Sequence, residues 1–161
     1  MPRLAALILL IAVALPAAAA QADWSAPRTV AAHARVLALA APGDRPAVLV
    51  DQTAGATHRV RLLTTDARGR TRVARTYASP AQPFGGHLWA TSRGDLVAAW
   101  SDHPRGGGRR VVVATGASLQ RRQVLATDVE DVRGLDLAVN ARGDALAVFV
   151  RRAGDTRTLA V

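Results

Sequence analysis

The feature of this sequence that most constrains its fold is a short pattern that occurs three times. Each copy consists of an apolar stretch, a Gly-Asp pair and a second apolar stretch, and the pairs begin at Gly43, Gly94 and Gly143. The copies are 51 residues apart (43 to 94) and then 49 residues apart (94 to 143). A near-constant period of this size is typical of repeat architectures, in which each unit buries its apolar residues against its neighbours.

Each copy of the pattern predicts a unit of short antiparallel strands. The central glycine supplies the positive φ that a tight hairpin turn requires, so the apolar stretches on its two sides are predicted to be strands one and two. Strands three and four are predicted at Arg59–Thr65 and Thr71–Tyr77 in the first unit, and at Arg109–Thr115 and Arg121–Thr127 in the second. We place the repeats at approximately residues 33–79, 84–128 and 133–161. Outside the N-terminal segment, no window has a helical period.

The length and strand content of one unit match those of a β-propeller blade. The chain resembles secreted bacterial β-propeller-like repeat proteins, in which a Gly-Asp or Gly-Asn turn precedes an apolar strand that ends in an aromatic residue. Leu49, Trp100 and Phe149 occupy that last position here. The resemblance covers Val30–Val161 and implies an all-β, β-propeller-like array of about three four-stranded antiparallel blades.

The ends of the repeated region raise the question of how such an array closes. The third unit stops after its third predicted strand, at Thr156–Val161, and Ala26–Ala31 resembles the strand that would follow. Three alternatives stay open: the array is completed by a homodimer, it is a partial propeller within a longer protein, or it remains open.

Residues 1–22 are predicted to be a signal peptide. Arg3 supplies the positive start, Leu4–Leu15 is an apolar run, and Ala20-Gln21-Ala22 fits the cleavage rule. The run is too short to span a bilayer, which needs about 20 residues. We therefore predict a repeat domain over residues 23–161, secreted or periplasmic, with no transmembrane anchor after cleavage.

The chain is strongly basic. It has 21 Lys and Arg residues, all of them Arg, against 12 Asp and Glu, with a net charge of +9. In an exported protein this charge favours binding to an anionic surface polymer, a glycan or a protein. The alternative is that the arginines occupy exposed strand positions and keep the protein soluble. Export argues against nucleic acid as a partner.

The sequence offers no recognisable catalytic centre. Its four histidines have no metal-ligand spacing, Glu130 is the one glutamate, and there is no cysteine. We expect no cofactor and no metal, and we interpret the protein as a non-enzymatic binding or scaffold module. The alternative is a fragment of a propeller-fold glycoside hydrolase or lyase. Such enzymes need two facing carboxylates, so the catalytic blades that supply them would be missing from this fragment.

Two features suggest residues that contact a ligand. Trp89 replaces a small residue of the other repeats, so its ring either fills a gap between units or stacks on a sugar. The Gly106–Gly108 loop is flanked by arginines, and its backbone N–H groups suit an anion, although an ordinary flexible loop has the same composition. The candidate ligand-binding residues are Trp89, His103, Arg105, Arg109 and Arg110.

Overall fold

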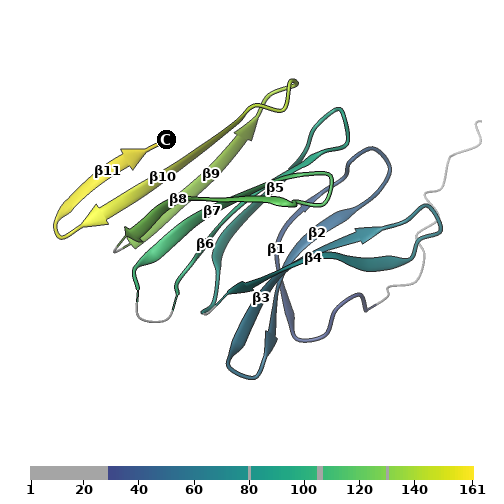
Figure 1. The fold of residues 1–161 in the computed structure, drawn as a ribbon, viewed down its shortest axis with the longest axis horizontal. Coiled ribbons are helices and arrows are strands. Elements are labelled where there is room, and N and C mark those ends of the chain that lie inside the picture. The colour runs from purple at the N-terminus through teal and green to yellow at the C-terminus, as the bar shows by residue number, and fades with distance from the viewer. Residues whose placement is uncertain (1–28, 80, 105–106, 130) are drawn as a thin grey trace, which may run out of the picture.

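The computed structural model describes residues 29–79, 81–104, 107–129 and 131–161, and these residues form strands and no helix (Figure 1). The predicted signal peptide and Arg105 lie outside the described residues. The strands are β1 (Ala34–Ala40), β2 (Ala47–Ala54), β3 (Thr57–Thr65), β4 (Thr71–Ser79), β5 (Phe84–Ala90), β6 (Leu96–Asp102), β7 (Arg109–Gly116), β8 (Arg121–Val129), β9 (Asp131–Val139), β10 (Ala145–Ala153) and β11 (Thr156–Ala160).

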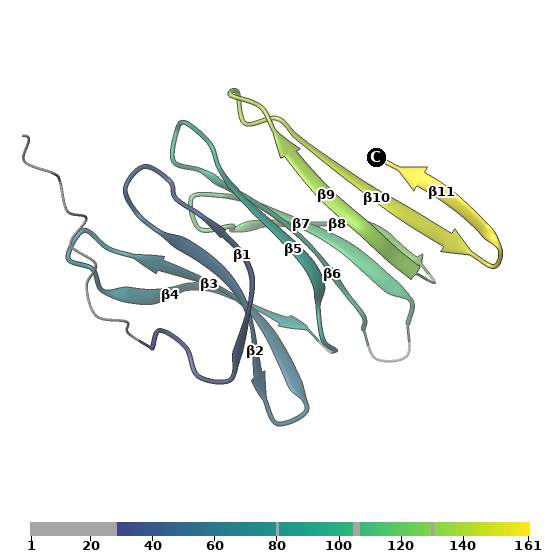
Figure 2. The same cartoon turned by 180° about the vertical axis from the view of Figure 1, so that it is seen from behind.

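The strands form three antiparallel sheets, each made from consecutive segments of chain. The first sheet has the order β1-β2-β3-β4, the second β5-β6-β7-β8 and the third β9-β10-β11. The prediction of an all-β fold is therefore confirmed, and the four strands predicted at 59–65, 71–77, 109–115 and 121–127 fall within β3, β4, β7 and β8. Figure 2 shows the first strand of each sheet, β1, β5 and β9, lying side by side.

The predicted glycine turns follow from local backbone geometry. Gly94 and Gly143 have φ values of 81° and 91°, which only glycine adopts without strain. Each N–H donates to a carbonyl three residues earlier, on Thr91 and Asn140. In the third sheet, the Asn140 side-chain oxygen also accepts the backbone N–H groups of Arg142 and Asp144. These hydrogen bonds fix both hairpins, and the one at Gly94 forms part of the candidate site described below.

Each sheet has two faces that differ in what they contact. We call the face that carries Leu49, Trp100 or Phe149 the front of its sheet, and the opposite face the back. Leu49 and Trp100 belong to one core cluster, so the first and second sheets pack front to front. Phe149 instead contacts Val111 on the back of the second sheet. If every sheet packed on the next in the same way, each contact would join a front to a back. The second and third sheets do so, whereas the first and second sheets pack front to front.

The core is centred on the second sheet, whose two faces are both covered. On its front, Trp100 is 1% exposed and its ring centroid lies 5.2 Å from that of Tyr77 on β4. The Tyr77 hydroxyl donates to the Leu119 carbonyl, which ties the first sheet to the β7–β8 turn. On the back, Val97 and Ala99 pack with Leu137 and Ala147 of the third sheet. Aliphatic side chains make up most of both interfaces, and Trp100, Tyr77 and Phe149 supply the aromatic part.

The predicted closing strand takes a different form. Of Ala26–Ala31, the described residues 29–31 belong to no strand. The chain continues past the first sheet, where the Ala32 carbonyl accepts a hydrogen bond from the Gln52 side chain. The third sheet, which holds the C-terminal end, lies on the far side of the second sheet from β1 (Figure 1).

Candidate functional site

Of the predicted ligand-binding residues, Arg110 is used within the fold. Its guanidinium Nε and Nη2 donate to the two carboxylate oxygens of Asp102 at 2.8 and 2.9 Å. Asp102 is 1% exposed, so this bidentate pair neutralises a carboxylate that the fold has removed from water. The hydrogen bond to Asp102 is the main reason that the pKa of Arg110 is raised above its usual value. We assign Arg110 to stability rather than to ligand binding.

The other predicted residues lie at two separate ends of the second sheet. Arg109 places its guanidinium carbon 5.0 Å from the ring centre of Phe84, and the exposed His103 follows β6 at the same end. Trp89 is 46% exposed and pairs with Val97 beside the β5–β6 turn. Trp89 lies five positions from Phe84, and a strand rises about 3.3 Å per residue. The structure therefore does not bring Trp89 together with His103, Arg109 and Arg110.

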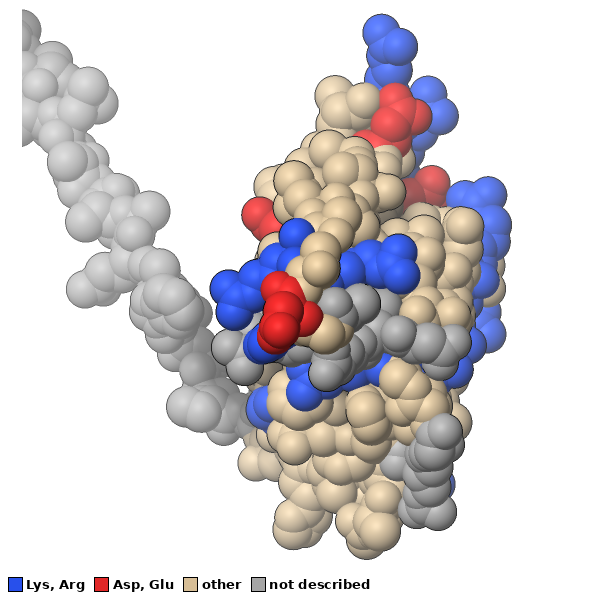
Figure 3. Space-filling view, turned by 90° about the vertical axis from the view of Figure 1, so that its left-hand side faces the viewer, with Lys and Arg blue, Asp and Glu red and all other residues tan. Residues whose placement is uncertain are grey.

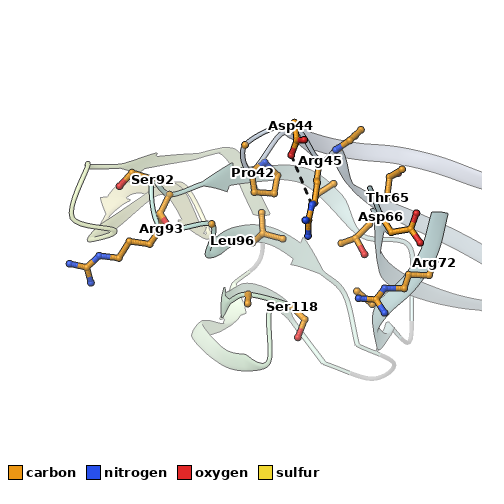
Figure 4. A pocket seen from close by; sticks show the side chains of 18 residues that line it. Pro42, Asp44, Arg45, Thr65, Asp66, Arg72, Ser92, Arg93, Leu96 and Ser118 are labelled. Atoms are coloured by element: carbon orange, nitrogen blue, oxygen red, sulfur yellow. Dashed lines mark ion pairs between the residues drawn. The ribbon is translucent and has the colours of Figure 1, made fainter. Parts of the chain in front are cut away.

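A cavity lies between the first and second sheets, at the end where their hairpin turns meet. We call this 770 Å³ cavity the turn pocket. The β1–β2 turn, the end of β3 and the start of β4 line one side, and the β5–β6 and β7–β8 turns line the other. The side chains that shape its chemistry are Arg45, Arg72, Thr65, Asp66, Ser92, Ser118 and Leu96 (Figure 4).

Two guanidinium groups occupy the turn pocket. In Figure 4, Arg45 reaches in from the β1–β2 turn and Arg72 from β4, whereas Arg93 points away from the cavity. Arg45 is 4.0 Å from its neighbour Asp44, but both side chains are largely exposed, so water weakens this pair. Arg72 has no ion-pair partner among the described residues. The pocket thus presents two cations that a bound anion can reach.

Two carboxylates line the turn pocket: Asp44, which lies beside Arg45, and Asp66, which is already engaged. Asp66 accepts hydrogen bonds from the backbone N–H groups of Arg68 and Arg70 at 2.9 Å, and from the Arg70 side chain at 3.0 Å. The Arg70 backbone hydrogen bond contributes most to lowering the pKa of Asp66 below its ordinary 3.8. Asp66 therefore fixes the β3–β4 turn and competes little for Arg72.

Acid should remove the contribution of Asp66 to stability. Because the pKa of its folded form is lowered, that contribution is present above the ordinary value of 3.8 and is lost as the pH falls through the folded pKa. We expect Asp66→Asn to unfold at lower urea concentration than the parent at about pH 7, and the difference to shrink below about pH 4. Urea midpoints measured for both proteins across this range check the prediction. A difference that stays constant on acidification would contradict it.

Sequence reasoning missed Arg45 and Arg72. Arg45 stands where the other copies of the pattern have Leu96 and Ala145, and Arg72 lies 27 positions further on (45 to 72), so the repeat does not connect the two. Strand pairing within the first sheet places Arg72 beside Thr64 and Thr64 beside Ala47, and the front-to-front packing of the second sheet closes the cavity around them. The available signal was the turn at Pro42–Pro46, which prolines flank and which carries an arginine after its Gly-Asp pair, where the other copies have neither.

Comparisons with protein-family models, with curated proteins and with solved structures find no match to this chain. The described part of the chain contains no helix long and apolar enough to cross a membrane. Within that part there is also no group of three or more His, Asp or Glu side chains placed to hold a metal ion.

Proposed function

We propose that this protein is an exported, non-enzymatic module that binds an acidic glycan in the turn pocket. We further propose that each of its three sheets is a blade-like unit of the β-propeller type, with the first two units packed front to front. Support for export comes from the pattern of residues 1–22, and support for blades from the repeated Gly-Asp turns and the adjacent first strands β1, β5 and β9.

The observation that carries the proposal is the pair of arginines, Arg45 and Arg72, directed into one concave site (Figure 4). A guanidinium binds a carboxylate, sulfate or phosphate group through parallel N–H donors. The cavity of 770 Å³ lies within the usual range for small-ligand sites, which is about 300–1,000 Å³. It has room for a few sugar residues.

The remaining lining suits the neutral part of a sugar. Thr65, Ser92 and Ser118 provide hydroxyl groups that both donate and accept hydrogen bonds. Pro42, Pro46 and Ala74, which also line the cavity and are not buried, offer apolar surface for the C–H faces of a ring. Charged groups at the walls and an apolar floor are the expected combination for an acidic saccharide.

Isothermal titration of the full chain with oligogalacturonate, a carboxylated glycan, tests this function. We expect binding that weakens as salt is added, because both arginines are within reach of solvent ions. Arg72→Gln should weaken it by about tenfold, the equivalent of one charge-assisted hydrogen bond. A neutral dextran of the same length should bind no more than weakly.

Arg157→Gln is the matched control, because it removes one exposed positive charge from β11, outside the turn pocket. Its affinity should stay close to that of the parent. An equal loss in both variants would show that net charge alone attracts the glycan, and an absence of binding by the parent would refute the proposal.

A further inference from the structure

A second, smaller hollow lies on the other side of the β5–β6 turn, between the second and third sheets. Its volume is about 220 Å³. Three arginines from three different elements line it: Arg93 from the β5–β6 turn, Arg121 from β8 and Arg142 from the β9–β10 turn. We call it the three-arginine pocket. Figure 3 shows Arg side chains, in blue, standing out at the top of the molecule, the end where these turns lie.

The backbone around the three-arginine pocket is held in place. The Ser92 hydroxyl donates to the Ala141 carbonyl at 3.3 Å, which joins the two turns that carry Arg93 and Arg142. The Arg142 N–H is itself bound by the Asn140 side chain at 2.9 Å. Arg121 is paired with Thr115 in the β7–β8 ladder, so its backbone is fixed as well. The three side chains therefore start from ordered positions.

The charge in the three-arginine pocket is not balanced by the protein. Asp95 is the one carboxylate in its lining, against three guanidinium groups. None of Arg93, Arg121 and Arg142 has an ion-pair partner among the described residues. Like charges gathered around a small hollow repel one another, and an anion in the hollow would relieve that repulsion.

The size of the hollow and the number of donors select a type of anion. A planar carboxylate presents two oxygens and can be satisfied by one guanidinium in the bidentate geometry. A sulfate or phosphate ester has three terminal oxygens, which three arginines arriving from different directions can bind together. Thr91 and Thr115 add hydroxyl donors at the rim.

We propose that the three-arginine pocket binds one sulfate or phosphate ester group. Thr91, Arg93 and Leu96 line both this pocket and the turn pocket, so the two hollows adjoin across the β5–β6 turn. Arg93 points away from the turn pocket (Figure 4). A sulfated glycan therefore fits both hollows at once, and this extension to a glycan rests on the function proposed above. Arg93 and Arg142 each precede a Gly-Asp pair of the repeat, so these two turn positions have a role beyond forming the turn.

The experiment first uses inorganic sulfate as the probe. Sulfate is added to the full ¹⁵N-labelled chain, and the arginine Nε–H signals are followed by NMR. We expect the signals of Arg93, Arg121 and Arg142 to shift, and each of these signals is assigned by its absence in the variant that lacks that arginine. Arg121→Gln and Arg142→Gln should each weaken sulfate binding by about tenfold, whereas Arg72→Gln and Arg157→Gln should not. Unchanged sulfate affinity in both pocket variants would overturn the proposal. Urea midpoints confirm that each variant is folded, and Arg142→Lys, which keeps the charge, should retain part of the affinity.

The second arm compares short dextran sulfate with oligogalacturonate and with inorganic phosphate. Dextran sulfate should bind more tightly than inorganic sulfate and lose affinity in both Arg72→Gln and Arg142→Gln. Phosphate binding that depends equally on Arg142 supports the pocket and extends its ligand class. If sulfate binds but neither glycan binds, the three-arginine pocket stands and the glycan function fails. If oligogalacturonate binds through Arg72 while sulfate affinity ignores Arg121 and Arg142, the glycan function stands and this inference fails.

Discussion

Replacing Trp100 with alanine should lower the free energy of unfolding by about 3–5 kcal/mol, the usual cost of deleting a large buried aromatic side chain. Trp100 is 1% exposed and stands where the fronts of the first and second sheets meet. Its loss removes the contact with Tyr77 and leaves a cavity that the flanking strands cannot fill. Urea unfolding followed by circular dichroism measures the change.

Trp89→Ala provides the comparison within the same sheet. The Trp89 side chain is 46% exposed, so the same substitution removes much less buried surface. We expect a loss of less than about 1.5 kcal/mol for this variant. Equal losses for the two tryptophan variants would mean that the front-to-front interface is not the main core.

Replacing Arg110 with alanine should lower the free energy of unfolding by about 3 kcal/mol, because it leaves the buried Asp102 carboxylate without its partner. Asp102 is 1% exposed and Arg110 has 24% of its side chain exposed. The expected loss of stability is therefore at the lower end of the range for breaking a buried ion pair, since water reaches the guanidinium. Asp102 raises the pKa of Arg110, so the arginine is charged at every accessible pH. Urea midpoints at neutral pH check the loss.

The double variant Asp102→Leu with Arg110→Met serves as the control for that prediction. Replacing both partners with apolar side chains leaves no unpaired charge, and such exchanges are often neutral or stabilising. We expect the double variant to recover most of the stability lost in Arg110→Ala. A double variant as unstable as the single one would show that Arg110 acts through packing of its aliphatic stem instead.

The hairpins were predictable because they depend on local sequence. A glycine at the turn, an Asn, Asp or Ser just upstream of it and apolar residues on either side determine a hairpin without help from the rest of the chain. The turns at Gly94 and Gly143 and the strands β3, β4, β7 and β8 were accordingly predicted within two residues at each end. Short-range hydrogen bonds leave few alternatives for such segments.

The packing of the sheets was not predictable from the same pattern. Leu49, Trp100 and Phe149 hold one position in the repeat, yet Leu49 and Trp100 share a cluster while Phe149 lies against the opposite face of the second sheet. Both faces of the strands are apolar, for example Val97 and Ala98 in β6, so hydrophobic patterning does not choose between them. The turn pocket depends on that choice, which is why Arg45 and Arg72 escaped notice.

The front-to-front contact also determines how the stack of sheets ends. With both fronts of the first pair engaged and the front of the third sheet against the second, the two outermost surfaces are backs, exposing Val36 and Leu39 on one and Leu146 and Leu159 on the other. Open-ended fibres need a surface on one molecule that complements a different surface on the next. The contact between the second and third sheets joins a back to a front, and the described residues leave no front free. Molecules of this protein therefore cannot extend into a filament by repeating their own internal contact.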